Sequence, residues 1–594
     1  MNTLIPLLIG LGCFLLASRT HAFYLGRHLG IDTRNLTPAH KLRDNRDYIP
    51  TRTHVVFAHH FSVIAGAGPI VGPILALVYG WVPAWFWIVL GCILFGAVHD
   101  MTSMFVSMRE DGRSIAEMCR RSLGGPGYLL LVAFLITMLT LINAIFLNLS
   151  CKALTASYPA ALLQIDSHSH LLNTAIGPDG VLMARIGGIA TTSMLIITAC
   201  APILGWLFFR RNTPALLLYS LAAGICVASV LAGFFYPVTL GETEWRSLLS
   251  LYVFIACWVP VWLILQPRDF VNVQILYVGI ILMLVGLIYY GFQGQTLNSN
   301  MFNIAAGARI TGPIWPFLLI TIACGAISGA HSLATTGTTV KQISSEADTR
   351  RVGYNAMLLE GAMALMALLL VAAALPKAEY LRIVFPASGD GNPILAFAVA
   401  MGYMLHDVAR IPISVGSVMG ILVLEGFVVT TLDTFIRLCR YMLEESWRFL
   451  CRSRPGALLI SPIFNTVLDV GLMLFFALNS TIISAWKIFG AGNQLIAALT
   501  LTVVTVWLLQ RGKTIWFTIL PAIFMLLTTY ATLLISLKNY LAPWGAGRLF
   551  NAGQGPLAGA ALILMVLASG VLLIAIRKFR ALLSAPHRSA SRHD

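Results

Sequence analysis

Long apolar segments separated by short polar ones dominate this sequence. Each apolar segment is about twenty residues long, the length of a helix that crosses a hydrocarbon core of ~30 Å. The pattern predicts about fifteen transmembrane helices. Their approximate ranges are 2–18, 54–80, 82–108, 128–150, 184–207, 214–236, 247–265, 273–292, 313–340, 353–375, 411–436, 463–480, 481–509, 515–537 and 556–576.

Composition agrees with an all-α polytopic membrane protein. The chain has 594 residues, of which 58% are hydrophobic and only 11% are charged. Soluble domains carry roughly 25% charged residues. Lipid must therefore cover much of the surface, and no stretch is polar enough to form a separate soluble domain.

The net charge of +15 raises the question of nucleic acid as a partner, and the positions of the charges exclude it. Most of the 39 Lys and Arg residues fall in alternate loops, from 19–53 to the tail at 577–594. Positive loops face the cytoplasm, so we expect an N-terminus outside and a cytoplasmic C-terminus. The remaining attraction is to membrane lipid. Residues Pro393–Ala409 break the alternation and are interpreted as a re-entrant or interfacial segment.

The first apolar segment is interpreted as a leader transmembrane helix, because no Lys or Arg precedes it as in a signal peptide. The ten cysteines are scattered mostly within spans and include no C-x-x-C pair. A disulfide framework or a zinc site is therefore not expected.

Two spans are interrupted in the middle by glycine, proline and hydroxyl residues. The first runs from His59 to Pro73 and contains Pro69, which disrupts a helix. The second runs from Gly325 to Thr339 and has six Ser and Thr residues between Ser328 and Thr339. Non-helical backbone at membrane depth is tolerated only where protein or a wet cavity satisfies it.

The two broken spans can be aligned on each other and are expected to cross the membrane in opposite directions, as in an inverted repeat. We predict a leader helix and loop at 1–53, a first repeat at 54–292, a second repeat at 313–576 and a cytoplasmic tail at 577–594. Repeats of five or of seven helices are equally compatible with the pattern. Paired broken helices indicate a substrate site near the midplane, although small residues also serve close helix packing.

The candidate substrate site combines the two broken spans with two amides in a later span. The amides either contact substrate or hold helices together. The candidate residues are His59, His60, Gly66, Gly68, Ser328, Gly329, His331, Ser332, Thr335, Thr336, Asn493 and Gln494. Without Cys or an H-x-x-x-H spacing, we expect these histidines to bind no metal.

Ionisable residues inside spans are costly and are functional candidates. Asp100, Glu360 and His331 are the candidates for proton coupling, since a carboxyl group in a low dielectric holds its proton. For Asp100 and Glu360 a purely structural ion pair is the alternative. Glu425, Asp469 and Lys487 are further ionisable residues within spans, and Asp433 is interpreted as an ion-pair partner of Arg437.

Three residues at span ends are candidates for a gate. Arg268 and Asp269 lie in Gln266-Pro267-Arg268-Asp269, interpreted as a short cytoplasmic loop that forms either a latch or a turn. Lys341 closes the second broken span and is equally explained as an ordinary positive flank.

Five motifs in order make the chain resemble the carbon starvation protein A (CstA) family. They are His59–Pro73, Gln266–Asn272, Ala323–Ile343, Thr430–Glu445 and Phe489–Leu499. The resemblance implies an inner-membrane uptake carrier for peptides or pyruvate, expressed in carbon starvation, with proton coupling for pyruvate, and distant kinship with the APC superfamily. Ala330 stands where many members have an aromatic residue.

We therefore predict a proton-coupled secondary transporter that imports peptides or small carboxylates such as pyruvate, with no cofactor. A channel or nutrient sensor is the alternative. An enzyme is not expected, because neither H-E-x-x-H nor G-x-S-x-G occurs.

Overall fold

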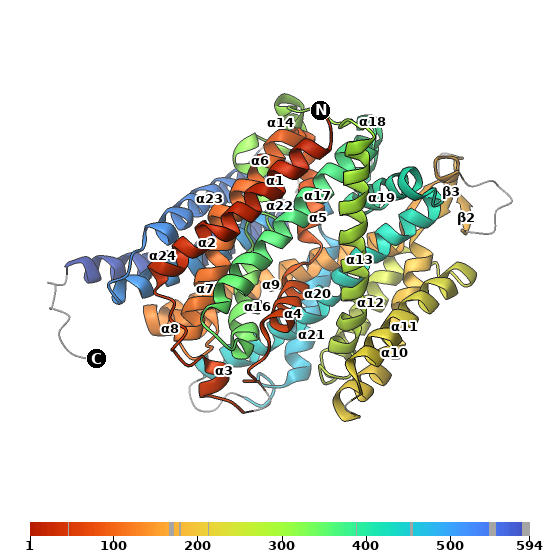
Figure 1. Ribbon diagram of the computed structural model, residues 1–594. Helices are drawn as coiled ribbons and strands as arrows, with labels where there is room; N and C mark the ends of the chain where they lie inside the picture. Colours follow the sequence, from red (N-terminus) through yellow and green to blue (C-terminus); the bar gives the residue numbers. More distant parts are fainter. Residues whose placement is uncertain are drawn as a thin grey trace.

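The computed structural model describes the whole chain except residues 45–46, 165–171, 178–179, 212, 388, 452–455, 546–553 and 585–594. Most of the described chain is helical, and its long helices run alongside one another in one bundle (Figure 1). The N-terminus lies at one end of this bundle, near α14 (Ile304–Thr311) and α18 (Lys377–Val384). The predicted class, an all-α polytopic membrane protein, is confirmed.

Among the described residues, 11 helices are long and apolar enough to cross a membrane, or up to 13 if each of two bent pairs is one span. All fifteen predicted ranges overlap helices, but the structure breaks or shortens several. Two helices in the predicted ranges, α12 (Glu242–Ala256) and α21 (Pro462–Leu478), have only 15 and 17 residues and are not among the 11. The lower count therefore reflects short and broken helices in apolar sequence.

The leader helix extends beyond the predicted apolar range 2–18. α1 (Leu4–Arg19) continues into α2 (His21–Leu29), and together they form a candidate span of 26 residues. The leader is fastened to the bundle, since Trp85 Nε1 donates to Pro6 O at 2.9 Å and Ser18 Oγ to Asn355 Oδ1 at 2.8 Å. A four-residue helix, α3 (Pro38–Lys41), follows.

The first predicted break is present. α4 (Thr53–Ile64) ends at a tight turn, and α5 (Gly68–Ala76) leaves at an angle of 49° and continues as η1 (Leu77–Tyr79). Pro69 lies in the first turn of α5, where a missing N–H costs nothing. The sequence thus ends one helix and begins another at membrane depth.

The second predicted break is wider. α15 (Ile314–Thr321) ends before eight non-helical residues, 322–329, after which α16 (Ala330–Gly337) and η4 (Thr339–Gln342) continue. Side chains from a neighbouring helix donate hydrogen bonds to backbone carbonyls that have lost their helical partners at the break. Trp486 Nε1 donates to Thr321 O at 3.0 Å and Gln494 Nε2 to Leu319 O at 2.8 Å.

Each break is followed along the chain by a helix with a π-helical turn. α6 (Trp81–Gly91) and α7 (Ala97–Arg109) are joined by η2 (Cys92–Gly96) into one span. α17 (Asn355–Ala374) begins with η5 (Thr349–Tyr354). Such turns often mark functional positions.

Two long helices cross the centre. α9 (Gly125–Leu154) follows the short α8 (Ile115–Leu123) and packs against α20 (Ile413–Leu450), and Tyr128 Oη donates to Glu445 Oε1 at 2.7 Å. α13 (Leu265–Phe292) packs on α20, and α22 (Ile482–Gln510) packs on α9.

Additional helices flank this centre on opposite sides in Figure 1. On one side α10 (Gly187–Arg210) and α11 (Ala215–Phe235) follow η3 (Ala160–Leu163) and a three-stranded antiparallel sheet in the order β1-β3-β2. Its strands are β1 (Ser157–Pro159), β2 (Thr174–Ile176) and β3 (Leu182–Arg185). On the other side lie α23 (Trp516–Gly545) and α24 (Gln554–Ser584). The first residues of the expected tail, 577–584, are thus helical, and 585–594 lie outside the described residues.

Two sequence interpretations of local structure are wrong. Gln266–Asn272 belongs to the first turns of α13 and is not a loop. Residues 437–450 of the expected loop at 437–461 are the helical end of α20. Pro393–Ala409 is one continuous helix, α19, which is mostly buried and packs against α17 and α20; its interpretation as a re-entrant or interfacial segment stays a prediction.

Candidate functional site

His331 lies at the start of the half-helix α16 and meets two carboxyl groups from two other helices. Its Nδ1 lies 2.8 Å from Asp100 Oδ2 on α7, and its Nε2 lies 3.1 Å from Glu360 Oε2 on α17. Asp100 and Glu360 are completely buried, and His331 is 3% exposed. The three residues that the sequence suggested for proton coupling therefore form one cluster.

A second histidine fixes Asp100 from its other side. His99 Nδ1 lies 2.7 Å from Asp100 Oδ1, so each carboxylate oxygen faces one imidazole. With both Nδ1 atoms protonated, Asp100 accepts two hydrogen bonds and stays ionised, because hydrogen bonds to the charged form favour it. This arrangement leaves the Nε2 side of His331 facing Glu360.

Glu360 and His331 together have room for one exchangeable proton. The distance between Glu360 Oε2 and His331 Nε2 is that of an ion pair, yet neither Glu360 oxygen makes a hydrogen bond to any described residue. A buried carboxylate without hydrogen bonds is costly. The proton can be placed on Glu360, which is then a neutral acid, or on His331, which is then an imidazolium. In either position Glu360 does not face His331 as a carboxylate without a cationic or hydrogen-bonded partner.

Asn493 on α22 holds the non-helical segment and caps α16. Its Oδ1 accepts from Ala330 N at 3.0 Å, its Nδ2 donates to Ser328 Oγ at 3.1 Å, and its carbonyl accepts from Gly329 N at 3.1 Å. Gly329 is required here, because a Cβ would collide with the backbone of α22 at Asn493 and with Ile496. The sequence left two roles open for these amides, contact with substrate or contact between helices. In this structure both Asn493 and Gln494 form hydrogen bonds to backbone groups of the second broken helix.

The hydroxyl residues of α16 divide into bonded and free ones. Ser332 Oγ donates to Gly329 O at 2.7 Å, and Thr336 Oγ1 accepts from Ile115 N at 3.1 Å. Thr335 is fully buried, and its Oγ1 has no partner among the described residues. Thr335 is therefore the hydroxyl of α16 whose bonding capacity remains available.

The first broken helix lies next to this cluster. His60 Nδ1 lies 3.0 Å from Thr339 Oγ1 just beyond α16, and the charges of Asp100 and His331 act on His60. A Cβ on Gly68 would collide with Cys324 in the second break. Gly66, by contrast, faces Thr431 of α20, and His59 is partly exposed. The two breaks thus meet, as the aligned motifs suggested.

Of the three gate candidates, Arg268 and Asp269 lie beside each other at the start of α13, whereas Lys341 makes separate contacts. Arg268 is 1% exposed and pairs with Asp433 of α20, with 2.7 Å between Nη2 and Oδ2. Asp269 has an oxygen, Oδ1, without a partner among the described residues. Lys341 places Nζ 5.3 Å from the ring centroid of Tyr48 in the loop before α4.

The predicted ion pair between Asp433 and Arg437 is wrong. Asp433 binds Arg268 and the hydroxyl of Tyr252, while Arg437 donates to the backbone carbonyls of Ala256 and Val259. A spacing of four residues permits contact on one helix face, but the short α12 ends beside α20 and offers Arg437 unpaired carbonyls.

Sequence reasoning missed several partners in these networks. Tyr252, Thr339 and Thr500 bond to Arg268, His60 and Ser332, respectively. In the sequence, these residues are marked only as polar residues within apolar spans. Single hydroxyl residues are common in membrane helices, so this mark does not identify particular ones. Among the described residues, no cluster of three or more His, Cys, Asp or Glu has metal-binding geometry.

Comparison with known proteins identifies relatives over nearly the whole chain. The model of the family "Carbon starvation protein CstA" matches residues 2–392 and 387–532. The peptide transporter CstA of Campylobacter jejuni is 30% identical over 86% of this chain and 76% of its own length. The pyruvate/proton symporter BtsT of Escherichia coli is 28% identical over 87% and 79%, and the peptide transporter CstA of Bacillus subtilis 28% over 95% and 94%.

Among solved structures, MhsT in complex with L-phenylalanine aligns with a TM-score of 0.45 and 12% identity, covering 90% of this chain and all of that one. A manganese transporter of Eremococcus coleocola aligns with a TM-score of 0.37 and 12% identity, covering 91% and 99%.

The relatives by sequence are named as transporters, which confirms the predicted class, a transporter and not an enzyme. The family match extends through both broken helices and through the helices that carry Asp100, Glu360 and Asn493. The chain belongs to the carbon starvation protein CstA family.

Proposed function

We propose that this chain is a proton-coupled importer of small carboxylates such as pyruvate, or of short peptides, in the bacterial inner membrane. The observation that carries the proposal is the buried cluster of Asp100, His331 and Glu360 beside two broken helices. Relatives named for peptide transport and for pyruvate/proton symport supply the two substrate classes. The role in carbon starvation follows from the family.

Proton binding at this cluster is coupled mechanically to α16. His331 belongs to α16, whereas Asp100 and Glu360 belong to α7 and α17. Loss of the exchangeable proton leaves two carboxylates against a neutral imidazole in a dry environment, which favours water entry and separation of these helices. Gain of the proton restores the attraction between His331 and the two carboxyl groups. The protonation state therefore biases α16 between two positions, which alternating access requires.

The substrate is proposed to bind where the two breaks meet. Pyruvate and peptides both carry a carboxylate, and the N-termini of the half-helices α5 and α16 present the positive ends of their dipoles there. The residues proposed to form this site are His59, His60, Gly66 and Gly68 from the first break, and Ser328, Gly329, His331, Ser332, Thr335 and Thr336 from the second. Thr335, buried and without a partner, has an available hydroxyl for the substrate.

An inverted repeat of five plus five helices within 54–292 and 313–576 fits the elements better than seven plus seven. The first members, α4–α5 and α15–α16, are broken, and the second members, α6–α7 and α17, each send a carboxyl group to His331. The third members, α9 and α20, are long and cross. The fourth, α12 and α21, are short and pack together, and the fifth are α13 and α22. The helices α10 and α11 are then an insertion.

The experiment is uptake by proteoliposomes that contain the purified chain, with labelled pyruvate and a labelled dipeptide, with and without an inward proton gradient. Saturable accumulation that depends on the gradient is expected for at least one substrate. His331→Gln and Asp100→Asn are expected to reduce it at least tenfold, while His28→Gln, at a partly exposed position of α2, leaves it unchanged. Uptake that never saturates would instead indicate the channel alternative, and absence of uptake by folded protein would refute the substrate assignment.

A further inference from the structure

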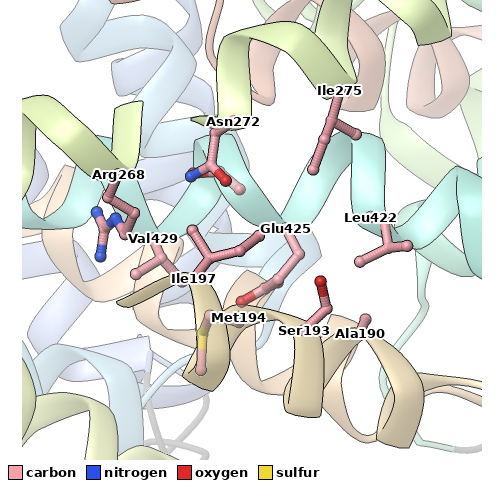
Figure 2. A pocket seen from close by; sticks show the side chains of 11 residues that line it. Ala190, Ser193, Met194, Ile197, Arg268, Asn272, Ile275, Leu422, Glu425 and Val429 are labelled. Carbon is pink, nitrogen blue, oxygen red and sulfur yellow. The ribbon is translucent and has the colours of Figure 1, made fainter. Parts of the chain in front are cut away.

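A cavity lined mostly by apolar side chains, with four polar ones among them, lies between α10, α13 and α20, away from the cluster at His331. Figure 2 shows Glu425 and Arg268 among its lining side chains, with Ser193 of α10 and Asn272 of α13 facing the same space. The space inside it is small but large enough to hold water. Asp100, His331 and Glu360 do not line this cavity.

Glu425 is the unusual member of the cavity. Its side chain is 1% exposed and neither carboxyl oxygen has a hydrogen-bond partner among the described residues. In Figure 2 the side chain leaves α20 toward the α10 side of the cavity, near Met194 and Ser193. An ionised carboxylate left in this state is strongly destabilising, so Glu425 is a neutral acid in this conformation.

The charges around Glu425 come from α13 and α20. The guanidinium of Arg268 lines the cavity, but it is bound by Asp433, Tyr252 and Thr430, and its Nε is unpartnered. Asp269 adds another carboxyl beside Arg268. Cys151 of α9 is close enough to Glu425 for the two groups to interact electrostatically, and the α10 residues that line the cavity carry no charge. Arg437 also acts on Asp433, whereas Asp269 and Glu425 share the one guanidinium of Arg268, which Asp433 already binds.

We propose that Glu425 is a second proton-binding site of the transport cycle, distinct from the His331 cluster. This proposal rests on the proposed function and adds a second coupling residue to it. Glu425 accepts a proton from water in the cavity and holds it as a neutral acid. It returns the proton to water when the cavity opens, and the carboxylate formed is then stabilised by Arg268, whose unpartnered Nε is available to it. Asn272 and Ser193 position the water through which the proton leaves.

Two measurements on Glu425→Gln test this assignment, with Glu445→Gln, an exposed position of the same helix, as the control. The first compares proton-driven accumulation with counterflow, in which labelled and unlabelled substrate exchange without a gradient. Glu425→Gln is expected to abolish accumulation, with a final inside-to-outside ratio near one, and to keep counterflow within about twofold. Normal accumulation by Glu425→Gln would overturn the proposal.

The second measurement does not depend on the substrate. The infrared difference spectrum of wild type minus Glu425→Gln at pH 7 is expected to contain the carbonyl band of a neutral carboxylic acid, which shifts in deuterium oxide. A difference spectrum with only carboxylate bands would overturn the proposal. If wild type transports neither substrate while the acid band is present, the proposed substrate class fails and the protonation site stands.

Discussion

Arg268 is a buried cation whose partner is distant in sequence. The guanidinium is 1% exposed and binds Asp433, 165 positions further along the chain, together with Tyr252. Removal of one partner from a buried ion pair leaves an unpaired charge and typically costs about 3–5 kcal/mol, whereas removal of both costs much less. The pair is therefore suited to a double-mutant cycle.

Arg268→Gln and Asp433→Asn are each expected to lower the stability of the purified protein by about 3–5 kcal/mol, because each leaves a buried charge uncompensated. The double variant should be more stable than either single one. Thermal unfolding in detergent measures all four proteins. Additive losses in the double variant would show that the pair contributes no coupling energy.

Asp390, in the loop before α19, gives a pH-dependent prediction outside the membrane spans. Its Oδ2 accepts from Ile482 N at 3.1 Å, yet burial raises the pKa of the carboxyl above its usual value of 3.8. Because the folded state then binds the proton more tightly than the unfolded state, the wild type loses stability as the pH rises above about 4. Asp390→Asn keeps the acceptor and removes the titration.

The unfolding temperature of Asp390→Asn relative to wild type should therefore increase between pH 4 and pH 7. Glu117→Gln in α8, whose pair with Arg113 is partly exposed, is the control and should show no such trend. A constant difference across this range would contradict the raised pKa.

At the scale of elements, the second break depends on α22. Sequence predicted that residues 325–339 would not be a plain helix, but not that α22 supplies their hydrogen-bond partners. The close approach at Gly329 lets Asn493 reach three backbone or side-chain groups of the break. The broken helix is therefore stable only against this neighbour.

Gly329→Ala is expected to abolish transport and to reduce stability by about 1–3 kcal/mol, the usual effect of overpacking. Gly337→Ala, at the other end of α16, is the control, because a Cβ there meets nothing within 4 Å. Uptake and thermal unfolding of the two variants are compared. Equal tolerance of both substitutions would show that α16 and α22 do not need this contact.

For the whole molecule, the orientation in the membrane remains a prediction from charge. The positive-inside rule places the C-terminus in the cytoplasm, and α24 carries Arg577, Lys578 and Arg580 near its end. A green fluorescent protein fused to the C-terminus is therefore expected to fluoresce, and an alkaline phosphatase fused there to be inactive. The opposite pair of results would invert the topology.

The fold class followed from sequence because lipid imposes a simple requirement on each span. A segment of about twenty apolar residues must be helical at membrane depth, whatever its neighbours are. The same requirement exposed the two breaks, since Pro69 and the hydroxyl residues after Ser328 do not suit a lipid-facing helix. It did not give the lengths of α12 and α21, because helix ends within apolar sequence depend on the helices packed beside them.

The sequence by itself determined the membrane class, the two broken helices and the set of ionisable residues at membrane depth. Only the tertiary structure decided which of them meet: His331 joins Asp100 and Glu360, Arg268 joins Asp433, and Glu425 faces a separate cavity. The physical reason is that hydropathy along a span reports depth in the membrane, whereas partners on different helices are selected by packing. Asp100 and His331 are 231 positions apart, and no local pattern records their contact.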